Sequence, residues 1–310
     1  MFRRTIAIAA ALSVLALGSP LISSCANPLA NNSFNGGVEK YEQGDYQGAI
    51  TDFTKAIEIN PDFVNAFLNR GAAKKELGDY QGAISDYTKA IEINPKSALA
   101  YNNRGNAKSK LGDYQGAFAD FNKAIEFDSQ DAIAYLNRGV TKNKLGDHQG
   151  AIADYTKAIE INPKLVLAYY NRANAKSDLK DYQGAIADYT KAIEIDPQHA
   201  KSYSNRGVAK YDLKDYQGAI ADYNMAIEVN PNDAIAYNNR GSAKDDSKDY
   251  QGAISDFTKT IDIKPQYASA YVNRGIARES VNDLEGACRD WRKATEFGLI
   301  QPAEWVKKQC

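Results

Sequence analysis

Apolar and polar positions follow one another along this chain in a pattern that returns every 34 residues. In residues 98–131, Tyr101 and Gly105 fall on one face of a first predicted helix. Ala117 and Phe121 fall at helical spacing on the apolar face of a second helix. The pattern therefore predicts one pair of helices in each 34-residue unit. Such a pair is too small to bury its apolar faces alone, so successive units are expected to stack.

The turn between the two helices carries the sequence Asp-Tyr-Gln-Gly-Ala-Ile or a close variant. Its eight copies begin at Asp45, Asp79, Asp113, Asp147, Asp181, Asp215, Asp249 and Asp283. Gly112 is predicted to end the first helix of its unit, and Asp113 to cap the second by accepting hydrogen bonds from free N–H groups. A proline such as Pro95 ends the second helix of most units.

Alignment on this turn divides residues 30–301 into eight units, within which positions are numbered 1–34. The units are 30–63, 64–97, 98–131, 132–165, 166–199, 200–233, 234–267 and 268–301. Weak helix formers such as Asn31 and Gly36 open the first unit, so its first helix is expected to fray. The pattern restarts in residues 302–310, which are predicted to form a capping half-repeat on the last unit.

The N-terminus has the layout of a bacterial export signal. Arg3 and Arg4 precede an apolar run over residues 5–17 that is shorter than the roughly 20 residues of a membrane-spanning helix. The following segment ends at Cys25 and resembles a lipobox, in which this cysteine would be lipidated. The alternative is ordinary cleavage after Ala26. We therefore predict a signal peptide over residues 1–25 and a short polar tether over 26–32.

Six recurring positions make the units resemble the tetratricopeptide repeat: an aromatic residue at 4, Gly at 8, Ala at 20, an aromatic residue at 24, Ala at 27 and Pro at 32. The departures are Ser33, Ser129, Ala173, Thr260 and Leu299. Position 7, usually leucine in the family, is arginine in the second to eighth units, and position 11 is always Lys or Arg. The resemblance implies an all-α fold, in which helix pairs stack into a right-handed solenoid and the first helices line a concave groove.

The composition and charge of the chain argue against several classes of function. The net charge of −1, without a basic block in the units, argues against nucleic acid as a partner. Two histidines and three cysteines are too few and too scattered for most metal-site patterns, and no Ser-His-Asp or Cys-His arrangement can be assembled from the sequence. No glycine-rich phosphate loop is present in the sequence. We therefore predict a non-catalytic chain with no cofactor and no metal.

Position 6 is asparagine in every unit and is expected on the groove side of the first helix. These residues are Asn35, Asn69, Asn103, Asn137, Asn171, Asn205, Asn239 and Asn273. A primary amide both donates and accepts hydrogen bonds, which suits the backbone of an extended peptide. In the alternative, each amide bonds a neighbouring backbone group and makes the stack rigid.

Positions 2, 5, 9, 12 and 13 are expected to set the specificity of the groove. They supply an apolar strip of Leu99, Ile133, Leu136, Val140, Leu167 and Tyr170, of which Leu136 and Tyr170 are predicted to be exposed. Lysines precede aspartates and a glutamate along the chain at positions 12 and 13, so the groove is predicted to be polarised. These residues are Lys75, Lys110, Lys144, Asp178, Asp212, Asp245, Asp246 and Glu279.

Together these features predict an exported scaffold that faces the periplasm, carries a lipid anchor and binds a protein or an extended peptide in its groove. A soluble periplasmic or secreted protein is the alternative location. The alternative function is a self-associating structural or assembly factor of the cell envelope. The sequence leaves the oligomeric state open.

Two further expectations concern pairs of side chains. Cys288 and Cys310 form an even pair and are predicted to make a disulfide, with a buried free thiol as the alternative. Position 23 is aspartate in every unit, and each aspartate is predicted to pair with the cation 18 residues later, in the next unit. Asp290 would then pair with Lys308.

Overall fold

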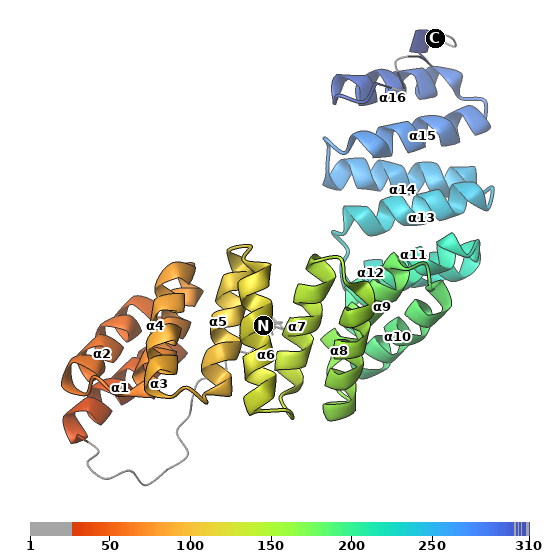
Figure 1. Cartoon of the computed structure of the whole chain (residues 1–310). Coiled ribbons are helices and arrows are strands. Elements are labelled where there is room, and N and C mark those ends of the chain that lie inside the picture. The colour runs from red at the N-terminus through yellow and green to blue at the C-terminus, as the bar shows by residue number, and fades with distance from the viewer. Residues whose placement is uncertain (1–26, 301, 303, 305, 308–309) are drawn as a thin grey trace. The chain divides into compact units, whose positions relative to one another are not determined.

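The computed structural model describes residues 27–300, 302, 304, 306, 307 and 310. In this described part the secondary structure is entirely helical, which confirms the all-α prediction (Figure 1). The helices are α1 (Pro28–Glu42), α2 (Tyr46–Ile59), α3 (Val64–Glu76), α4 (Tyr80–Ile93), α5 (Ala98–Lys110), α6 (Tyr114–Phe127), α7 (Ala132–Lys144), α8 (His148–Ile161), α9 (Val166–Asp178), α10 (Tyr182–Ile195), α11 (Ala200–Asp212), α12 (Tyr216–Val229), α13 (Ala234–Asp246), α14 (Tyr250–Ile263), α15 (Ala268–Ser280) and α16 (Leu284–Glu296).

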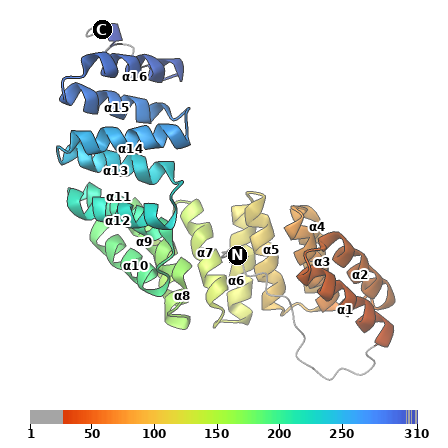
Figure 2. The ribbon, with the colours of Figure 1, turned by 180° about the vertical axis from the view of Figure 1, so that it is seen from behind.

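The chain divides into two compact parts, an N-terminal part up to Ile161 and a C-terminal part from Asn162. Each part holds four helix pairs, in which an odd-numbered first helix packs against the even-numbered second helix that follows it. Within each part, a second helix also packs against the first helix of the next pair, so successive pairs stack on one another (Figure 2). This is the stacking that the 34-residue period predicts.

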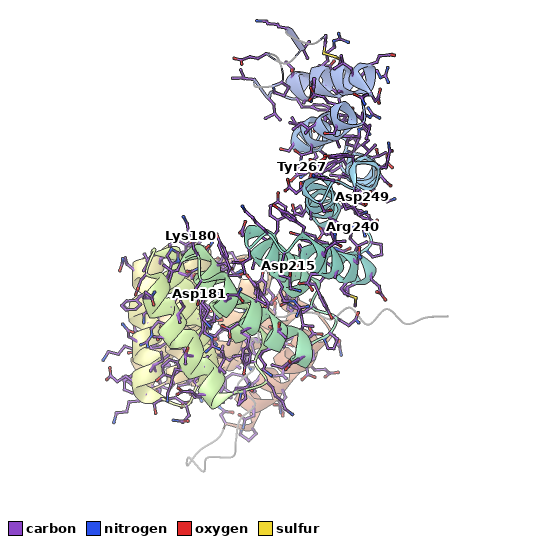
Figure 3. The ribbon with its side chains drawn as sticks, turned by 90° about the vertical axis from the view of Figure 1, so that its right-hand side faces the viewer. Lys180, Asp181, Asp215, Arg240, Asp249 and Tyr267 are labelled. Atoms are coloured by element: carbon purple, nitrogen blue, oxygen red, sulfur yellow. A yellow bond between two sulfur atoms is a disulfide. The ribbon has the colours of Figure 1, made fainter. Side chains whose placement is uncertain are left out.

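The turns form as their residues predict. Gly112 has φ +83°, a left-handed conformation that ends α5 without the steric cost of a Cβ atom. Asp113 then caps α6 by accepting a hydrogen bond from the N–H of Gly116 at 2.9 Å. In the C-terminal part, the position of Gly112 is taken by Lys180, Lys214, Lys248 and Asn282, which adopt the same left-handed conformation; Figure 3 shows Lys180 beside the capping Asp181.

Glycine at position 8 fixes the register of each helix pair. A Cβ atom on Gly105 would lie 2.9 Å from the ring of Phe121, closer than side chains approach one another. The buried ring of Phe121 therefore packs directly against the backbone of α5 at Gly105. Because the two helices run antiparallel, position 7 then lies beside position 23 of the same unit.

This register makes the prediction of ion pairs between units wrong. Asp120 accepts hydrogen bonds from Nε and Nη2 of Arg104 at 2.9 and 2.7 Å, and Nζ of Lys108 lies 2.8 Å from the same carboxylate. The arginine is 16 residues before the aspartate, in the same unit. Asp86, Asp154, Asp188, Asp222, Asp256 and Asp290 are paired in the same way with the cations at positions 7 and 11 of their own units.

The first unit shows why position 11 matters. Gly36 replaces the arginine at position 7, and Asp52 is instead paired with Lys40 at position 11 and with Lys55. The lysine or arginine at position 11 of every unit is therefore a signal in the sequence for pairing within the unit. Lys308, the partner predicted for Asp290, lies outside the described residues.

The arginines do connect neighbouring units, but through a neutral acceptor. Nη1 of Arg104 donates to the hydroxyl oxygen of Thr88 in the preceding unit at 3.1 Å. Nη1 of Arg138 donates to the amide oxygen of Asn122 at 2.8 Å. Both arginines thus join the aspartate of their own unit to position 25 of the unit before it.

The first segment differs in part from its prediction, whereas the predicted disulfide near the C-terminus is confirmed. Asn27 caps α1 and Pro28 opens it, so residues 28–32 of the predicted tether are helical and α1 runs to Glu42. Proline is suited to this first position because its missing N–H would have no partner in the helix. At the other end, a disulfide joins Cys288 of α16 to Cys310, with a Cα–Cα distance of 5.8 Å. Cys25 lies outside the described residues.

Candidate functional site

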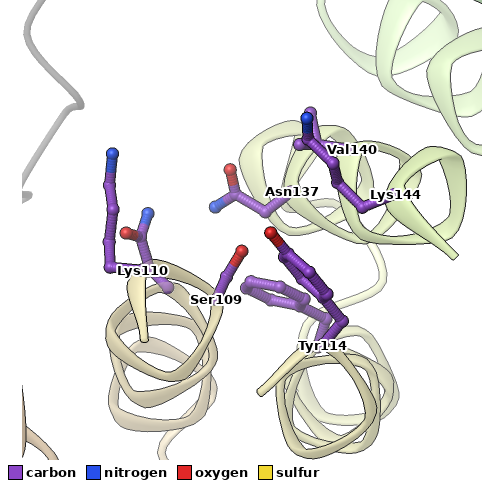
Figure 4. A pocket seen from close by; sticks show the side chains of 8 residues that line it. Ser109, Lys110, Tyr114, Asn137, Val140 and Lys144 are labelled. Atoms are coloured by element: carbon purple, nitrogen blue, oxygen red, sulfur yellow. The ribbon is translucent and has the colours of Figure 1, made fainter. Parts of the chain in front are cut away.

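A pocket opens between α5 and α7 in the N-terminal part. Its volume is ≈ 380 Å³, and it is lined by Asn106, Ser109, Lys110, Tyr114, Phe121, Asn137, Val140 and Lys144. Helices α5 and α7 supply the polar walls, and Figure 4 shows Ser109, Asn137 and Tyr114 between the two lysines. The buried ring of Phe121 on α6 forms the floor. The pocket is therefore a polar cleft over an aromatic base.

Two pockets in the C-terminal part are built from equivalent positions. One, of ≈ 280 Å³, is lined by Asn174, Ser177, Asp178, Tyr189, Asn205 and Val208. The other, of ≈ 330 Å³, is lined by Val208, Tyr211, Asp212, Tyr223, Asn239 and Ser242. As in the N-terminal pocket, positions 9, 12, 13 and 24 of one unit face positions 6 and 9 of the next. We call the three the inter-unit pockets.

The asparagine at position 6 lines each inter-unit pocket, and some of these amides bond the preceding unit. Asn137 donates from Nδ2 to Oδ1 of Asn102 at 3.1 Å, and Asn273 donates to Asn238 at 3.3 Å. Asn205 donates to the hydroxyl oxygen of Tyr170 at 3.2 Å and to Asn174 at 3.0 Å. The alternative of bonding to a neighbour therefore holds for these three, with side-chain acceptors in place of the backbone.

The three engaged amides each have a side-chain acceptor at position 5 of the preceding unit. Where that position is Asn or Tyr, an acceptor is within reach. Before Asn103 it is Leu68, and before Asn239 it is the shorter Ser204. Among the described residues neither Asn103 nor Asn239 has a side-chain hydrogen bond, and the buried Nδ2 of Asn69 likewise has no acceptor there. Asn239 lines a pocket, so its amide is available to a ligand.

The pockets differ in charge. Lys110 and Lys144 line the N-terminal pocket, and no carboxylate of the described residues forms an ion pair with either. Asp178 and Asp212 occupy the same position 13 in the two C-terminal pockets. The predicted order of lysines and then aspartates along the chain thus appears as oppositely charged pocket walls in the two parts.

Buried tyrosines on the pocket floors remain hydrogen-bond donors. Burial raises the pKa of Tyr189 to about 12, and its hydroxyl donates to Oδ1 of Asn174 at 2.6 Å. Burial likewise raises the pKa of Tyr223. The pKa of the Asp245 carboxyl is raised, first by burial and then by the neighbouring Asp246, which accepts a hydrogen bond from Tyr211. The floor residues Tyr189 and Tyr223 are therefore neutral at physiological pH.

The predicted exposure of Leu136 and Tyr170 is wrong. Leu136 is only 6 % exposed, and Tyr170 is half-buried against Ala173 and Tyr189. Both occupy position 5, where Leu68 of another unit lies in a core cluster with Ala100 of the next unit. Leu68 at position 5 therefore faces the next unit rather than solvent.

The structure brings four of the predicted groove residues together in one pocket and leaves Leu99, Ile133 and Leu167 outside the inter-unit pockets. Asn137, Val140, Lys110 and Lys144 share the N-terminal pocket. Leu99 packs against the core cluster that contains Leu68, Ile133 is half-buried outside the pocket lining, and Leu167 is exposed outside the C-terminal pockets. The pockets also use residues whose sequence positions indicate only the core, namely Phe121, Tyr189 and Tyr223 at position 24 and Tyr114 at position 17.

Metal ligands do not cluster in the described part of the chain. No group of three or more His, Cys, Asp or Glu residues there could hold a metal ion. Nδ1 of His148 lies 2.6 Å from the amide oxygen of Asn143, and Nδ1 of His199 lies 2.7 Å from the hydroxyl of Ser202.

The helices of this part lack the length and apolar composition needed to cross a membrane.

Stacked helix pairs with polar pockets between successive first helices define a helical-repeat protein of the kind that serves as an interaction scaffold. The family described as tetratricopeptide repeat matches residues 98–131, 132–165, 166–199, 200–233 and 234–267, and a related description, TPR repeat, matches 37–78 and 73–112. The chain belongs to the tetratricopeptide-repeat family. A comparison with curated protein sequences gave no match.

Solved structures with the same helix-pair fold include three informative cases. "Crystal structure of MamA protein" is 27% identical, with 57% of this chain and 96% of that one covered and a TM-score of 0.50. A tetratricopeptide repeat protein from Parabacteroides merdae is 20% identical, with coverages of 84% and 99% and a TM-score of 0.60. YrrB, titled "a TPR protein with an unusual peptide-binding site", is 24% identical, with coverages of 59% and 95% and a TM-score of 0.50.

Proposed function

We propose that the chain is a non-catalytic scaffold that binds an extended peptide segment of another protein in its inter-unit pockets. The observation that carries this proposal is the recurrence of one pocket design, with an asparagine wall and an aromatic floor, at equivalent positions of successive units. The amides serve the peptide backbone, and the pockets take its side chains. Because the walls are built on packed helices, binding requires little ordering of the scaffold.

Peptides selected from a random library against the purified chain provide the probe for this proposal. We expect Asn239→Ala to weaken their binding about tenfold, because its free amide is lost while no internal bond of the fold is broken. The melting temperature of this variant should stay that of the unmodified chain. Titration calorimetry and thermal unfolding measure the two quantities.

Asn273→Ala is the matched control, because the same residue type occupies the same position but lines none of the inter-unit pockets. Its amide donates to Asn238, so we expect a lower melting temperature and unchanged peptide affinity. Equal affinities for Asn239→Ala and the unmodified chain would contradict the role of the amides. A chain that selects no peptide would contradict the proposal as a whole.

We further propose that the chain is exported and anchored through Cys25. The basic and apolar residues before Cys25 support export, and so does the disulfide between Cys288 and Cys310, because such bonds persist in oxidising compartments. Labelling with a fatty-acid analogue should mark the membrane fraction of cells that express the chain, and Cys25→Ala should abolish the label. A chain that stays unlabelled and free of the membrane would contradict the anchor.

A further inference from the structure

The pocket between α5 and α7 has an unusual charge for this chain. Most lysines of the first helices are neutralised: Lys108 and Lys142, for example, lie 2.8 and 2.9 Å from the carboxylates of Asp120 and Asp154. Lys110 and Lys144 are two residues further along the same helices, and no carboxylate of the described part of the chain pairs with them. Two unpaired cations therefore face one pocket.

The two lysines lie on opposite walls. Figure 4 shows Lys110 on α5 and Lys144 on α7, with Ser109, Asn137 and Tyr114 between them. The hydroxyls of Ser109 and Tyr114 can donate hydrogen bonds, and the bond from Asn137 to Asn102 uses one of its two N–H groups. Every charged group that lines the pocket is cationic, and each remaining polar residue can donate.

We propose that this pocket selects an anionic side chain, Asp or Glu, of the bound peptide. The inference rests on the proposed peptide-binding function and adds the chemistry of the partner. A carboxylate between the two ammonium groups forms charge-assisted hydrogen bonds and gains further donors from the pocket wall. The aromatic floor of Phe121 excludes water beneath it, which strengthens these interactions. The same arrangement disfavours Lys and Arg at this place in the peptide.

Selection from a peptide library tests the proposal. The library is displayed with its C-terminus fused to the carrier, so carboxylates come only from Asp and Glu side chains. The unmodified chain is compared with a variant carrying Lys110→Glu and Lys144→Glu. We expect peptides enriched in Asp or Glu for the unmodified chain and loss of that enrichment, with a gain of Lys or Arg, for the variant. The best acidic peptide should bind the variant at least about tenfold more weakly, and binding to the unmodified chain should weaken with salt.

Lys96→Glu with Lys164→Glu makes the control variant, because both lysines are exposed in turns outside the pocket and the change in net charge is the same. It should select the same acidic peptides as the unmodified chain. Because all four lysines are at least partly solvent-exposed, thermal unfolding should be alike for the two variants; if the glutamates disturb folding, Lys110→Gln with Lys144→Gln replaces them. Peptides without acidic enrichment, or an equal loss in the control variant, would overturn this inference and leave the peptide-binding function intact. A chain that selects no peptide at all overturns both.

Discussion

Individual side chains set both the register of the helix pairs and the geometry of the pockets. In the units where all contacts are seen, each arginine at position 7 contacts the aspartate of its own unit, position 25 of the preceding unit and an aromatic ring. Arg104 makes two bonds to Asp120, donates to Thr88 and lies 5.5 Å from the centre of the Tyr101 ring. Asp120 is only 3 % exposed, so removal of either charged partner leaves the other without compensation in a largely dry site.

At the residue scale, we predict that the coupling free energy between an aspartate at position 23 and an arginine at position 7 is large only for the pair within one unit. A double-mutant cycle on Asp120→Ala and Arg104→Ala should show a coupling free energy of about 1–3 kcal/mol, as expected for contacting charged groups. The cycle on Asp120→Ala and Arg138→Ala should show coupling below about 0.5 kcal/mol, because Arg138 bonds Asp154 and Asn122 instead. Chemical denaturation gives the free energies of unfolding. Strong coupling in the second cycle alone would mean that the units pair across their boundary.

The helical periodicity of the sequence could not decide this pairing, because the two candidate cations at position 7 lie 16 and 18 residues from each aspartate, on opposite sides of it along the chain. Both choices satisfy the helical periodicity. What decides between them is the close approach of Gly105 to Phe121, which is a matter of how the two helices pack. The glycine at position 8 marks a close contact between helices in the sequence, but the register that this contact imposes on position 7 becomes visible only in the packed pair.

The helix pairs themselves follow from local sequence, because their ends are set by residues next to them in the chain. Asp113 and Gly112 predict the turn that the structure contains. The face of a first helix that meets the next unit could not be predicted in this way. Sequence periodicity locates the apolar stripe on a helix but does not identify the element that covers it. Leu136 was expected to be exposed in the groove and is instead buried. Leu68, at the same position 5 of another unit, lies in a core cluster with Ala100 of the next unit.

At the scale of the helix pair, we predict that the residue with left-handed backbone conformation after each first helix affects the free energy of unfolding. Lys214 has φ 64°, where a side chain carries a steric cost of roughly 1–2 kcal/mol that glycine avoids. Lys214→Gly should therefore raise the free energy of unfolding of the C-terminal part by about 1 kcal/mol. Lys214→Ala keeps the Cβ atom and should give no such gain. Chemical denaturation of the three chains measures the difference, and equal gains for Gly and Ala would contradict the conformational explanation.

Across the whole chain, repetition lets one pocket design recur with different chemistry on its walls. The asparagine of position 6 and the lysines at 110 and 144 are candidate contacts already in the sequence, and Asn137, Lys110 and Lys144 do meet in one pocket. The floors could not be predicted, because an aromatic residue at position 24 is buried whether or not its edge is reached from a pocket. Phe121 is only 1 % exposed and still lines one.

The central claim is that peptides occupy the inter-unit pockets, and site-specific photo-crosslinking tests it most directly. A photoreactive amino acid is placed at Val140 in the N-terminal pocket, at Val208, which lines both C-terminal pockets, or at the exposed Lys157 of α8 as a control. Mass spectrometry then measures the covalent yield with a library-selected peptide. We expect strong crosslinks from Val140 or Val208, or from both, and background yield from Lys157. A yield from Lys157 equal to or above that from both valines would contradict the claim.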